Sequence, residues 1–110
     1  MKTIRNIEAL NRLQGENDML LVYVGGRSCG VCHALEGKLD ALLLAYPAVI
    51  PVKIEAEDTP ELAAACGVFS VPALILFIQG KETLREAGIV HMDQVERKIA
   101  RYCTLLGDAP

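Results

Sequence analysis

The sequence has no hydrophobic run long enough to cross a lipid bilayer. Its longest nearly apolar stretches are Met19–Val24, Ala41–Val52 and Val71–Ile78, whereas a membrane-spanning helix needs at least about 18 apolar residues. Residues 1–13 also lack the uninterrupted apolar segment of a secretory signal peptide, because polar and charged side chains recur among them. We therefore expect a cytoplasmic protein that has no membrane partner.

The chain also lacks an excess of basic residues. Its 11 Lys and Arg residues are outnumbered by 14 Asp and Glu residues, which gives a net charge of −3. Nucleic-acid-binding proteins usually carry a basic patch or stripe, so we expect no nucleic-acid partner. Neither a GxGxxG nor a Walker A motif occurs, so we expect no nucleotide cofactor and no direct use of NADPH. The length of 110 residues, 52% of them hydrophobic, predicts one folded domain spanning residues 1–110.

What the sequence does contain is an alternation of short β-rich runs with segments of helical periodicity. The helical spacing predicts helices over 7–14 and 32–45, a short helix after Thr59 and Pro60, and a helix from Met92 onward. The β-rich runs predict strands over 19–24, 49–54, 72–78 and 83–87. Helical crossovers imply parallel strands, and the Gly80 turn implies a final hairpin. The pattern predicts an α/β fold with a central mixed sheet.

Four cysteines are present, and two of them form a CxxC pair. Cys29 and Cys32 follow the 19–24 run and open the next predicted helix. A helix N-terminus stabilises a thiolate through its unpaired N–H groups and its positive dipole end. Cys29 lies nearer the loop, so we expect it to be the attacking thiolate, with Cys32 as the resolving thiol one turn away. Gly30 lets a substrate backbone approach closely.

The segments LVYVGGRSCGVC and SVPALILF resemble the thioredoxin family, and the resemblance covers nearly the full length. It implies the thioredoxin-like fold, with helices on both faces of the sheet, and thiol–disulfide exchange. By the resemblance, Pro72 is a cis-proline, Val71 offers backbone hydrogen bonds to a substrate, and Gly30 and Val31 also contact that substrate. Disulfide-containing proteins are then the substrates, and an external thiol reductase or dithiol donor is the second partner.

The sequence departs from the family pattern at three positions around the cysteine pair. Ser28 stands where the family usually has Trp, Val31 where it often has Pro, and His33 where it often has Lys. We expect Ser28 and His33 to modulate the reaction, because both adjoin a reactive cysteine. A protonated His33 would lower the pKa of the Cys29 thiol.

A fourth departure lies beneath the cysteine pair. Tyr23 replaces the buried acid that, in the family, serves as a proton relay for the resolving thiol and neighbours a lysine. Lys53 matches that lysine. Without the acid, we expect Lys53 to be unpaired or to turn to Glu55, two residues along the same strand face. We expect the Tyr23 ring to lie in the core with its hydroxyl hydrogen-bonded.

Other interpretations of the motif compete with redox chemistry. The run from Cys29 to His33 is also a CxxCH pattern, which attaches c-type haem. The pair could form half of a zinc site, although Cys66 and Cys103 each stand alone in the sequence. Packing is the favoured role of both, and the alternative for Cys66 is a regulatory thiol near the substrate groove. A non-catalytic binding or redox-sensing module is a further alternative.

Overall fold

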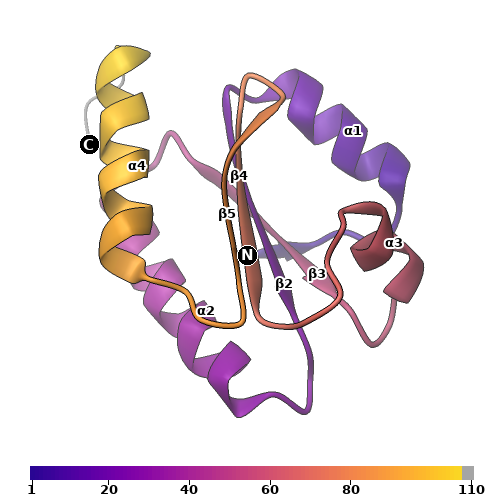
Figure 1. Cartoon of the computed structure of the whole chain (residues 1–110). Helices are drawn as coiled ribbons and strands as arrows, with labels where there is room; N and C mark the ends of the chain where they lie inside the picture. The colour runs from indigo at the N-terminus through magenta and orange to yellow at the C-terminus, as the bar shows by residue number, and fades with distance from the viewer. Residues whose placement is uncertain (108–110) are drawn as a thin grey trace.

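The β-rich runs of the sequence form one five-stranded sheet in the computed structural model, which describes residues 1–107 (Figure 1). One element lies outside the predicted pattern, a first strand of two residues. The elements are β1 (Lys2–Thr3), α1 (Ile7–Glu16), β2 (Met19–Gly25), α2 (Gly30–Leu43), β3 (Ile50–Glu55), α3 (Pro60–Ala65), β4 (Ala73–Ile78), β5 (Lys81–Ala87) and α4 (Met92–Leu105).

The strands are ordered β1-β3-β2-β4-β5, and the sheet is mixed as predicted. β1, β3 and β2 run parallel to one another, whereas β4 and β5 are antiparallel to their neighbours. Gln79 and Gly80 take positive φ values of 50° and 80°, which makes the tight turn of the β4–β5 hairpin. Every residue of β2 is buried, as expected for a central strand that is covered on both faces.

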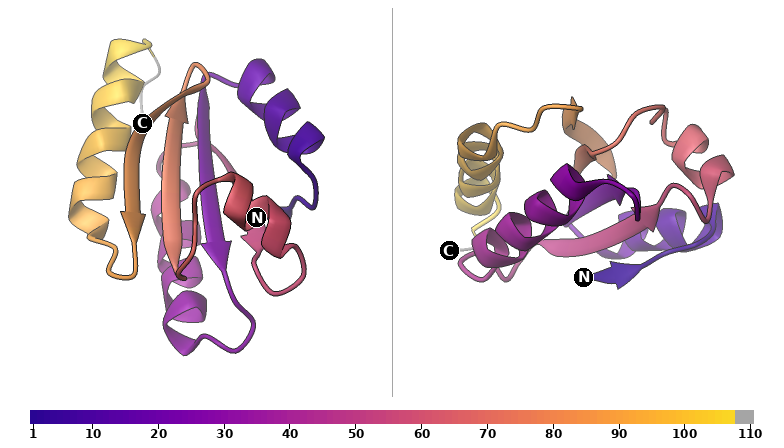
Figure 2. Two further views of the ribbon diagram at one scale, coloured as in Figure 1. Left: turned by 45° about the vertical axis from the view of Figure 1, so that its right-hand side comes forward. Right: turned by 90° about the horizontal axis from the view of Figure 1, so that it is seen from below.

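Helices cover both faces of the sheet (Figure 2). α2 and α4 pack on one face, and α1 and α3 pack on the other. Alternate residues of β2 point to opposite faces of the sheet. Met19, Leu21 and Tyr23 face α2 and α4, while the residues between them face α1 and α3. This two-sided burial explains why the strand reads as a continuous apolar run.

The observed ends of most elements differ from the predicted ones by one or two residues. α1 continues to Glu16 instead of ending at 14, α2 spans 30–43 instead of 32–45, and β5 begins at Lys81 instead of Thr83. Three strands differ by a single residue at an end: β2 ends at Gly25, β3 spans 50–55, and β4 begins at Ala73. β1 was not predicted, because its two residues become a strand only by pairing, Lys2 with Val52 and Thr3 with Lys53. These ends depend on neighbouring strands and turns that local periodicity does not record.

The sheet topology brings three chain segments together at one end of the molecule. Val24 of β2 pairs with Ala73 of β4, and Gly25 pairs with Glu55 of β3. The loop that leaves β2 therefore lies beside the segment that enters β4 and beside the turn that follows β3. This end of the sheet carries the cysteine pair.

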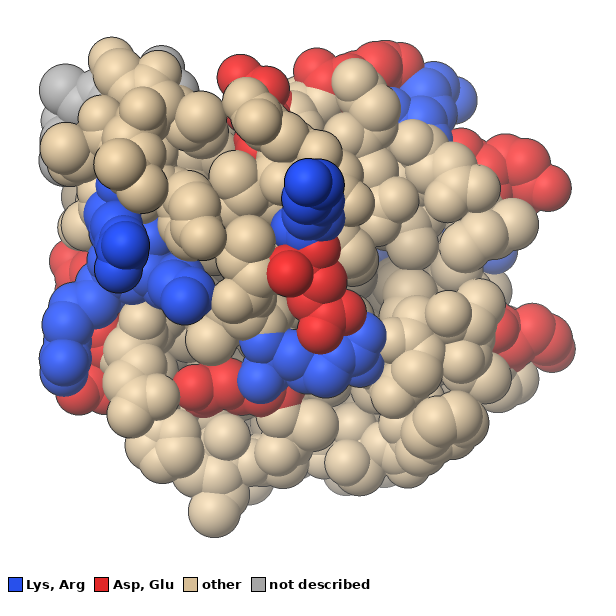
Figure 3. Space-filling view, turned by 45° about the horizontal axis from the view of Figure 1, so that its top comes forward, with Lys and Arg blue, Asp and Glu red and all other residues tan. Residues whose placement is uncertain are grey.

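None of the helices within residues 1–107 is long and apolar enough to cross a membrane. On the face shown in Figure 3, acidic and basic side chains lie next to one another. Among the described residues, Arg85 pairs with Glu82 at 2.8 Å, and Arg97 pairs with Asp93 at 2.9 Å. These pairs neutralise part of the local charge.

Candidate active site

Cys29 and Cys32 form a disulfide at the N-terminus of α2. Their Cα atoms lie 5.2 Å apart. Cys29 is the N-cap residue of the helix, and the backbone N–H of Cys32 donates to its Sγ at 3.2 Å. Cys29 is half-buried, whereas only 1% of Cys32 is exposed. The same N–H group and the helix dipole would stabilise a thiolate on Cys29 after reduction. The structure thus bears out the expected placement of the two sulfurs.

The segment that enters β4 lies beside Cys29, and the peptide bond between Val71 and Pro72 is cis. A side-chain carbon added at Gly26 would lie 3.5 Å from Cγ2 of Val71 and 3.9 Å from Cβ of Cys29. Val71 and Cys29 therefore border the same small space. Pro72 is buried next to them.

Apolar side chains are exposed on both sides of the cis-proline. Val31 is 66% exposed and Ile89 is 76% exposed, and both line a surface hollow that also includes Pro72. Phe69, 86% exposed, lines a second hollow together with Val71. An extended polypeptide lying across this end would bury apolar surface on either side of Cys29.

The Tyr23 side chain supports α2 from below. Only 1% of the residue is exposed, and its hydroxyl donates to the backbone oxygen of Cys32 at 2.7 Å. This confirms the expectation of a core tyrosine with a satisfied hydroxyl. Burial first, and then the nearby carboxylates of Glu36 and Glu55, raise the pKa of Tyr23 to about 12. The phenol is therefore a neutral donor at physiological pH.

We expect the Tyr23 phenol to ionise at a higher pH than an ordinary tyrosine. Its pKa of about 12 in the folded state exceeds the ordinary value of 10.0. The stability it contributes is thus complete below pH 10 and is lost as the pH rises toward 12. Ultraviolet absorbance of the phenolate measures this step, and Tyr23→Phe should remove it. A Tyr23 phenolate that forms near pH 10 in the folded protein would contradict the burial argument.

Lys53 has a partner that the sequence analysis missed. Its ammonium group lies 2.8 Å from Glu36 and 3.8 Å from Glu55. The expected approach to Glu55 is present, but the shorter contact is with α2. The hydrogen bond to Glu36 is the main reason why the pKa of Lys53 is raised. Glu36 lies four residues after Cys32, one helical turn along the same face, and that spacing was the available signal.

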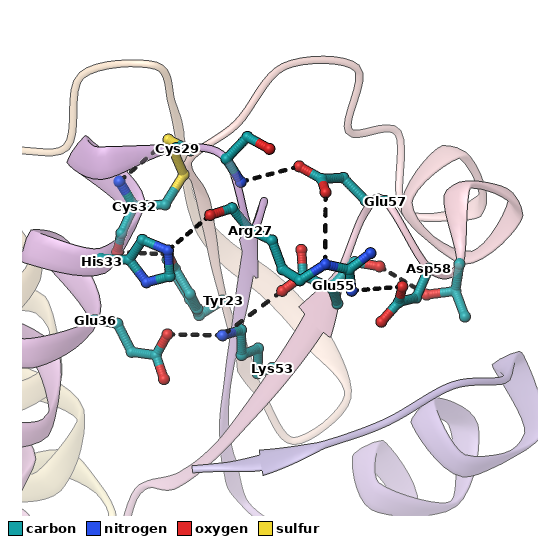
Figure 4. Close-up of polar contacts among 12 residues, drawn as sticks. Tyr23, Arg27, Cys29, Cys32, His33, Glu36, Lys53, Glu55, Glu57 and Asp58 are labelled. Carbon is teal, nitrogen blue, oxygen red and sulfur yellow. Dashed lines mark hydrogen bonds and ion pairs between the residues drawn. A yellow bond between two sulfur atoms is a disulfide. The ribbon is translucent and has the colours of Figure 1, made fainter.

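Glu55 is the buried acid of this region, at 7% exposure. One of its oxygens lies near Lys53, and the other is buried with no hydrogen-bond partner among the described residues. Tyr23, Glu36, Lys53 and Glu55 thus form a polar cluster under the first turns of α2 (Figure 4). The family's buried acid would lie at the position of Tyr23 on β2. In this chain the nearby carboxylates come instead from α2 and β3.

The loop between β2 and α2 is hydrogen-bonded to the turn that follows β3. The backbone N–H of Ser28 donates to Glu57 at 3.2 Å, and the Arg27 guanidinium donates to Asp58 at 2.6 Å. His33 is exposed, and its Nε2 lies 2.9 Å from the backbone oxygen of Arg27. Since a carbonyl only accepts, Nε2 carries the proton in this contact. Ser28 and His33 were expected near the site, whereas Glu57 and Arg27, which contact them, were not.

The other two cysteines lie away from the pair. Cys103 is buried in α4, and its Sγ lies 3.8 Å from the sulfur of Met19. Cys66 is half-buried at the end of α3, where burial raises the pKa of its thiol. Within residues 1–107, no three His, Cys, Asp or Glu side chains are grouped so that they could hold a metal ion.

Comparison with known proteins identifies the family. The thioredoxin family model matches residues 3–101. Thioredoxin-like protein YdfQ of Bacillus subtilis is 35% identical over 105 residues, covering 96% of this chain and 94% of that protein. Among solved structures, a mutant thioredoxin from Halobacterium salinarum has a TM-score of 0.83 and 27% identity, covering 92% of this chain and 88% of its own.

A second solved structure matches in the oxidised state. Oxidised mitochondrial thioredoxin 3 of Saccharomyces cerevisiae has a TM-score of 0.82 and 25% identity, and the match covers 92% of this chain and 94% of that one. The fold of this chain agrees with that of both solved structures. The chain therefore belongs to the thioredoxin family, and it is a thiol–disulfide oxidoreductase whose redox-active pair is Cys29 and Cys32.

Proposed function

We propose that this protein reduces disulfide bonds of other proteins, with Cys29 as the nucleophile and Cys32 as the resolving thiol. The observation that carries the proposal is the unequal burial of the pair. Cys29 is half-buried at the helix N-cap, whereas Cys32 is 1% exposed. An external disulfide can therefore reach Cys29, while Cys32 is restricted to an intramolecular attack.

The cycle transfers two electrons from the cysteine pair to the substrate. The Cys29 thiolate attacks one sulfur of the substrate disulfide, and the other substrate sulfur leaves as a thiolate that takes up a proton. Cys32 then loses its proton and attacks Sγ of Cys29. This step breaks the mixed disulfide, releases the second substrate thiol and forms the Cys29–Cys32 disulfide. The N–H of Cys32, 3.2 Å from Sγ of Cys29, favours the thiolate before the attack.

The substrate is proposed to lie extended between the cis-proline segment and the start of α2. Val71 would offer backbone hydrogen bonds there, and Gly30 would let the substrate backbone approach Cys29. A side-chain carbon added at Gly30 would meet nothing within 4 Å, so this surface is open. Val31 and Pro72 line the adjoining hollow and would contact apolar substrate side chains.

Four residues are proposed to modulate the reaction without contacting substrate sulfur. Tyr23 holds the backbone of Cys32, and Lys53 anchors α2 through Glu36. Ser28 and His33 hold the loop before Cys29.

The oxidised pair must be reduced again by an external dithiol or thiol reductase, and the only redox group proposed is the cysteine pair itself. Because the cycle consumes a thiol donor, we propose that it operates in the cytoplasm, where thiol systems keep cysteines reduced. The donor is then the second partner of the protein, besides its disulfide-containing substrates.

The proposal is tested by the reduction of insulin with a small dithiol as donor. Catalytic amounts of the protein should accelerate the appearance of insulin thiols, and the acceleration should vanish in Cys29→Ser. The Cys66→Ser variant is the matched control, and it should retain wild-type turnover. If the wild-type protein gave no acceleration over the dithiol alone, a binding or redox-sensing role would replace the reductase role.

A further inference from the structure

Three charged side chains hold the loop in front of Cys29, and we call Arg27, Glu57 and Asp58 the loop clamp. Arg27 donates to Asp58 at 2.6 Å, and its Nε lies 3.8 Å from Glu57. Its guanidinium points toward both carboxylates (Figure 4). The clamp joins the loop after β2 to the turn after β3. Because the three side chains are 40–57% exposed, each contact by itself contributes little to stability.

Glu57 is the clamp residue that faces the reactive cysteine. Its Oε1 accepts from the N–H of Ser28, the residue directly before Cys29, at 3.2 Å. A side-chain carbon added at Gly26 would lie 3.2 Å from this oxygen, 3.5 Å from Val71 and 3.9 Å from Cβ of Cys29. The carboxylate, the cis-proline segment and the nucleophile therefore surround one small space. A negative charge there opposes the formation of a thiolate on Cys29.

We propose that Glu57 and Arg27 are positioning residues that set the acidity of the Cys29 thiol with opposite signs. Glu57 holds the loop through the Ser28 N–H, and its charge keeps the thiol less acidic than the helix N-terminus alone would make it. Arg27 offsets part of that charge while it is itself held by Asp58. This inference rests on the proposed function, because thiol acidity governs both the attack and the redox poise of the pair.

Among the charged groups around Cys29, Glu57 is the anion next to it. On α2, His33 contacts the backbone oxygen of Arg27, and Lys38 lines the hollow that also includes Val31 and Pro72. The segments at 69–72 and 88–90 contain no ionisable side chain. The cluster of Tyr23, Glu36, Lys53 and Glu55 lies beneath α2, where it contacts Cys32 through its backbone oxygen.

The test compares Glu57→Gln with Arg27→Gln. Glutamine at position 57 keeps an oxygen that can accept from Ser28 but removes the charge, so the pKa of Cys29 should fall by roughly half a unit. Arg27→Gln removes the positive charge that partly offsets the Glu57 carboxylate, so the pKa of Cys29 should rise. Glu61→Gln is the matched control: it also removes one negative charge, four residues further along the chain, but Glu61 lines a different hollow. It should leave the pKa of Cys29 unchanged.

The pKa is measured as the pH dependence of Cys29 alkylation in the reduced protein, with the modified residue located by mass spectrometry. The equilibrium with glutathione gives an independent readout. A more acidic Cys29 stabilises the reduced form, so Glu57→Gln should shift this equilibrium toward the dithiol by up to about threefold, and Arg27→Gln should shift it the other way. Both shifts should shrink as salt is added.

A purely structural clamp would change both variants in the same direction, through a loosened loop, and would lower their thermal stability together. Same-direction shifts, or no shift in either variant, would overturn the inference. The proposed function fails separately: it fails if the wild-type protein does not reduce insulin. A wild-type protein that turns over, with variants whose Cys29 pKa does not diverge, would reject only the tuning role of the clamp.

Discussion

Replacing Cys32 with serine is expected to abolish turnover and to leave Cys29 trapped in mixed disulfides. In the oxidised structure the two cysteines share a disulfide at the start of α2, so Cys32 is the thiol placed to attack a substrate sulfur bound to Cys29. Serine keeps nearly the same volume in this buried position but supplies a far weaker nucleophile. Insulin reduction should fall to the rate of the dithiol alone.

Mass spectrometry of the Cys32→Ser protein after exposure to a disulfide substrate locates the trapped adduct. It should lie on Cys29, and it should vanish when Cys29 is also replaced. The exchange mechanism would be contradicted by wild-type turnover in Cys32→Ser. It would be contradicted equally by adducts that form only on Cys66, the half-buried cysteine at the end of α3.

The second large effect is expected at Gly25, which packs against the Tyr23 ring. An added side-chain carbon at Gly25 would lie 2.5 Å from the Tyr23 hydroxyl oxygen and 2.9 Å from the ring carbon that bears it. Both residues are buried, so the ring has little room to move. Gly25→Ala should lower the free energy of unfolding by about 1–3 kcal/mol. It should also weaken the hydrogen bond from Tyr23 to Cys32 and slow turnover.

A double-mutant cycle separates this clash from other effects of the substitution. Leucine at position 23 lacks the outer part of the ring, so Gly25→Ala should cost much less in the Tyr23→Leu background. Gly37→Ala is the control, because a side-chain carbon there meets nothing within 4 Å and alanine favours the helix interior. Equal costs of Gly25→Ala in both backgrounds, measured by chemical denaturation, would disprove the proposed contact.

The fold could be predicted because its main signals are local. The 19–24 run is apolar throughout since β2 is covered on both faces, and Pro60 marks the start of α3 at its first turn. The hairpin followed from the Gly80 turn, which takes a positive φ. β1 could not be found in this way, because two residues carry no periodicity and become a strand only through pairing with β3.

The active site could be predicted only in part. The CxxC spacing after a strand located the two sulfurs, and the resemblance to the family pointed to Pro72. The partners of Lys53 and Ser28 were missed, because Glu36 and Glu57 are brought to them by the packing of α2 and of the turn after β3. Long-range contacts of polar side chains leave no periodic pattern in a sequence.

The most direct test of the account is the reduction potential of the Cys29–Cys32 pair, measured by equilibration with glutathione and trapping of the remaining thiols. We predict that both thiols disappear together as a single two-electron couple, at a reducing potential near that of thioredoxin, about −270 mV. Failure of the two cysteines to form a reversible disulfide would contradict it. So would a potential near −120 mV, which is typical of a strong disulfide oxidant.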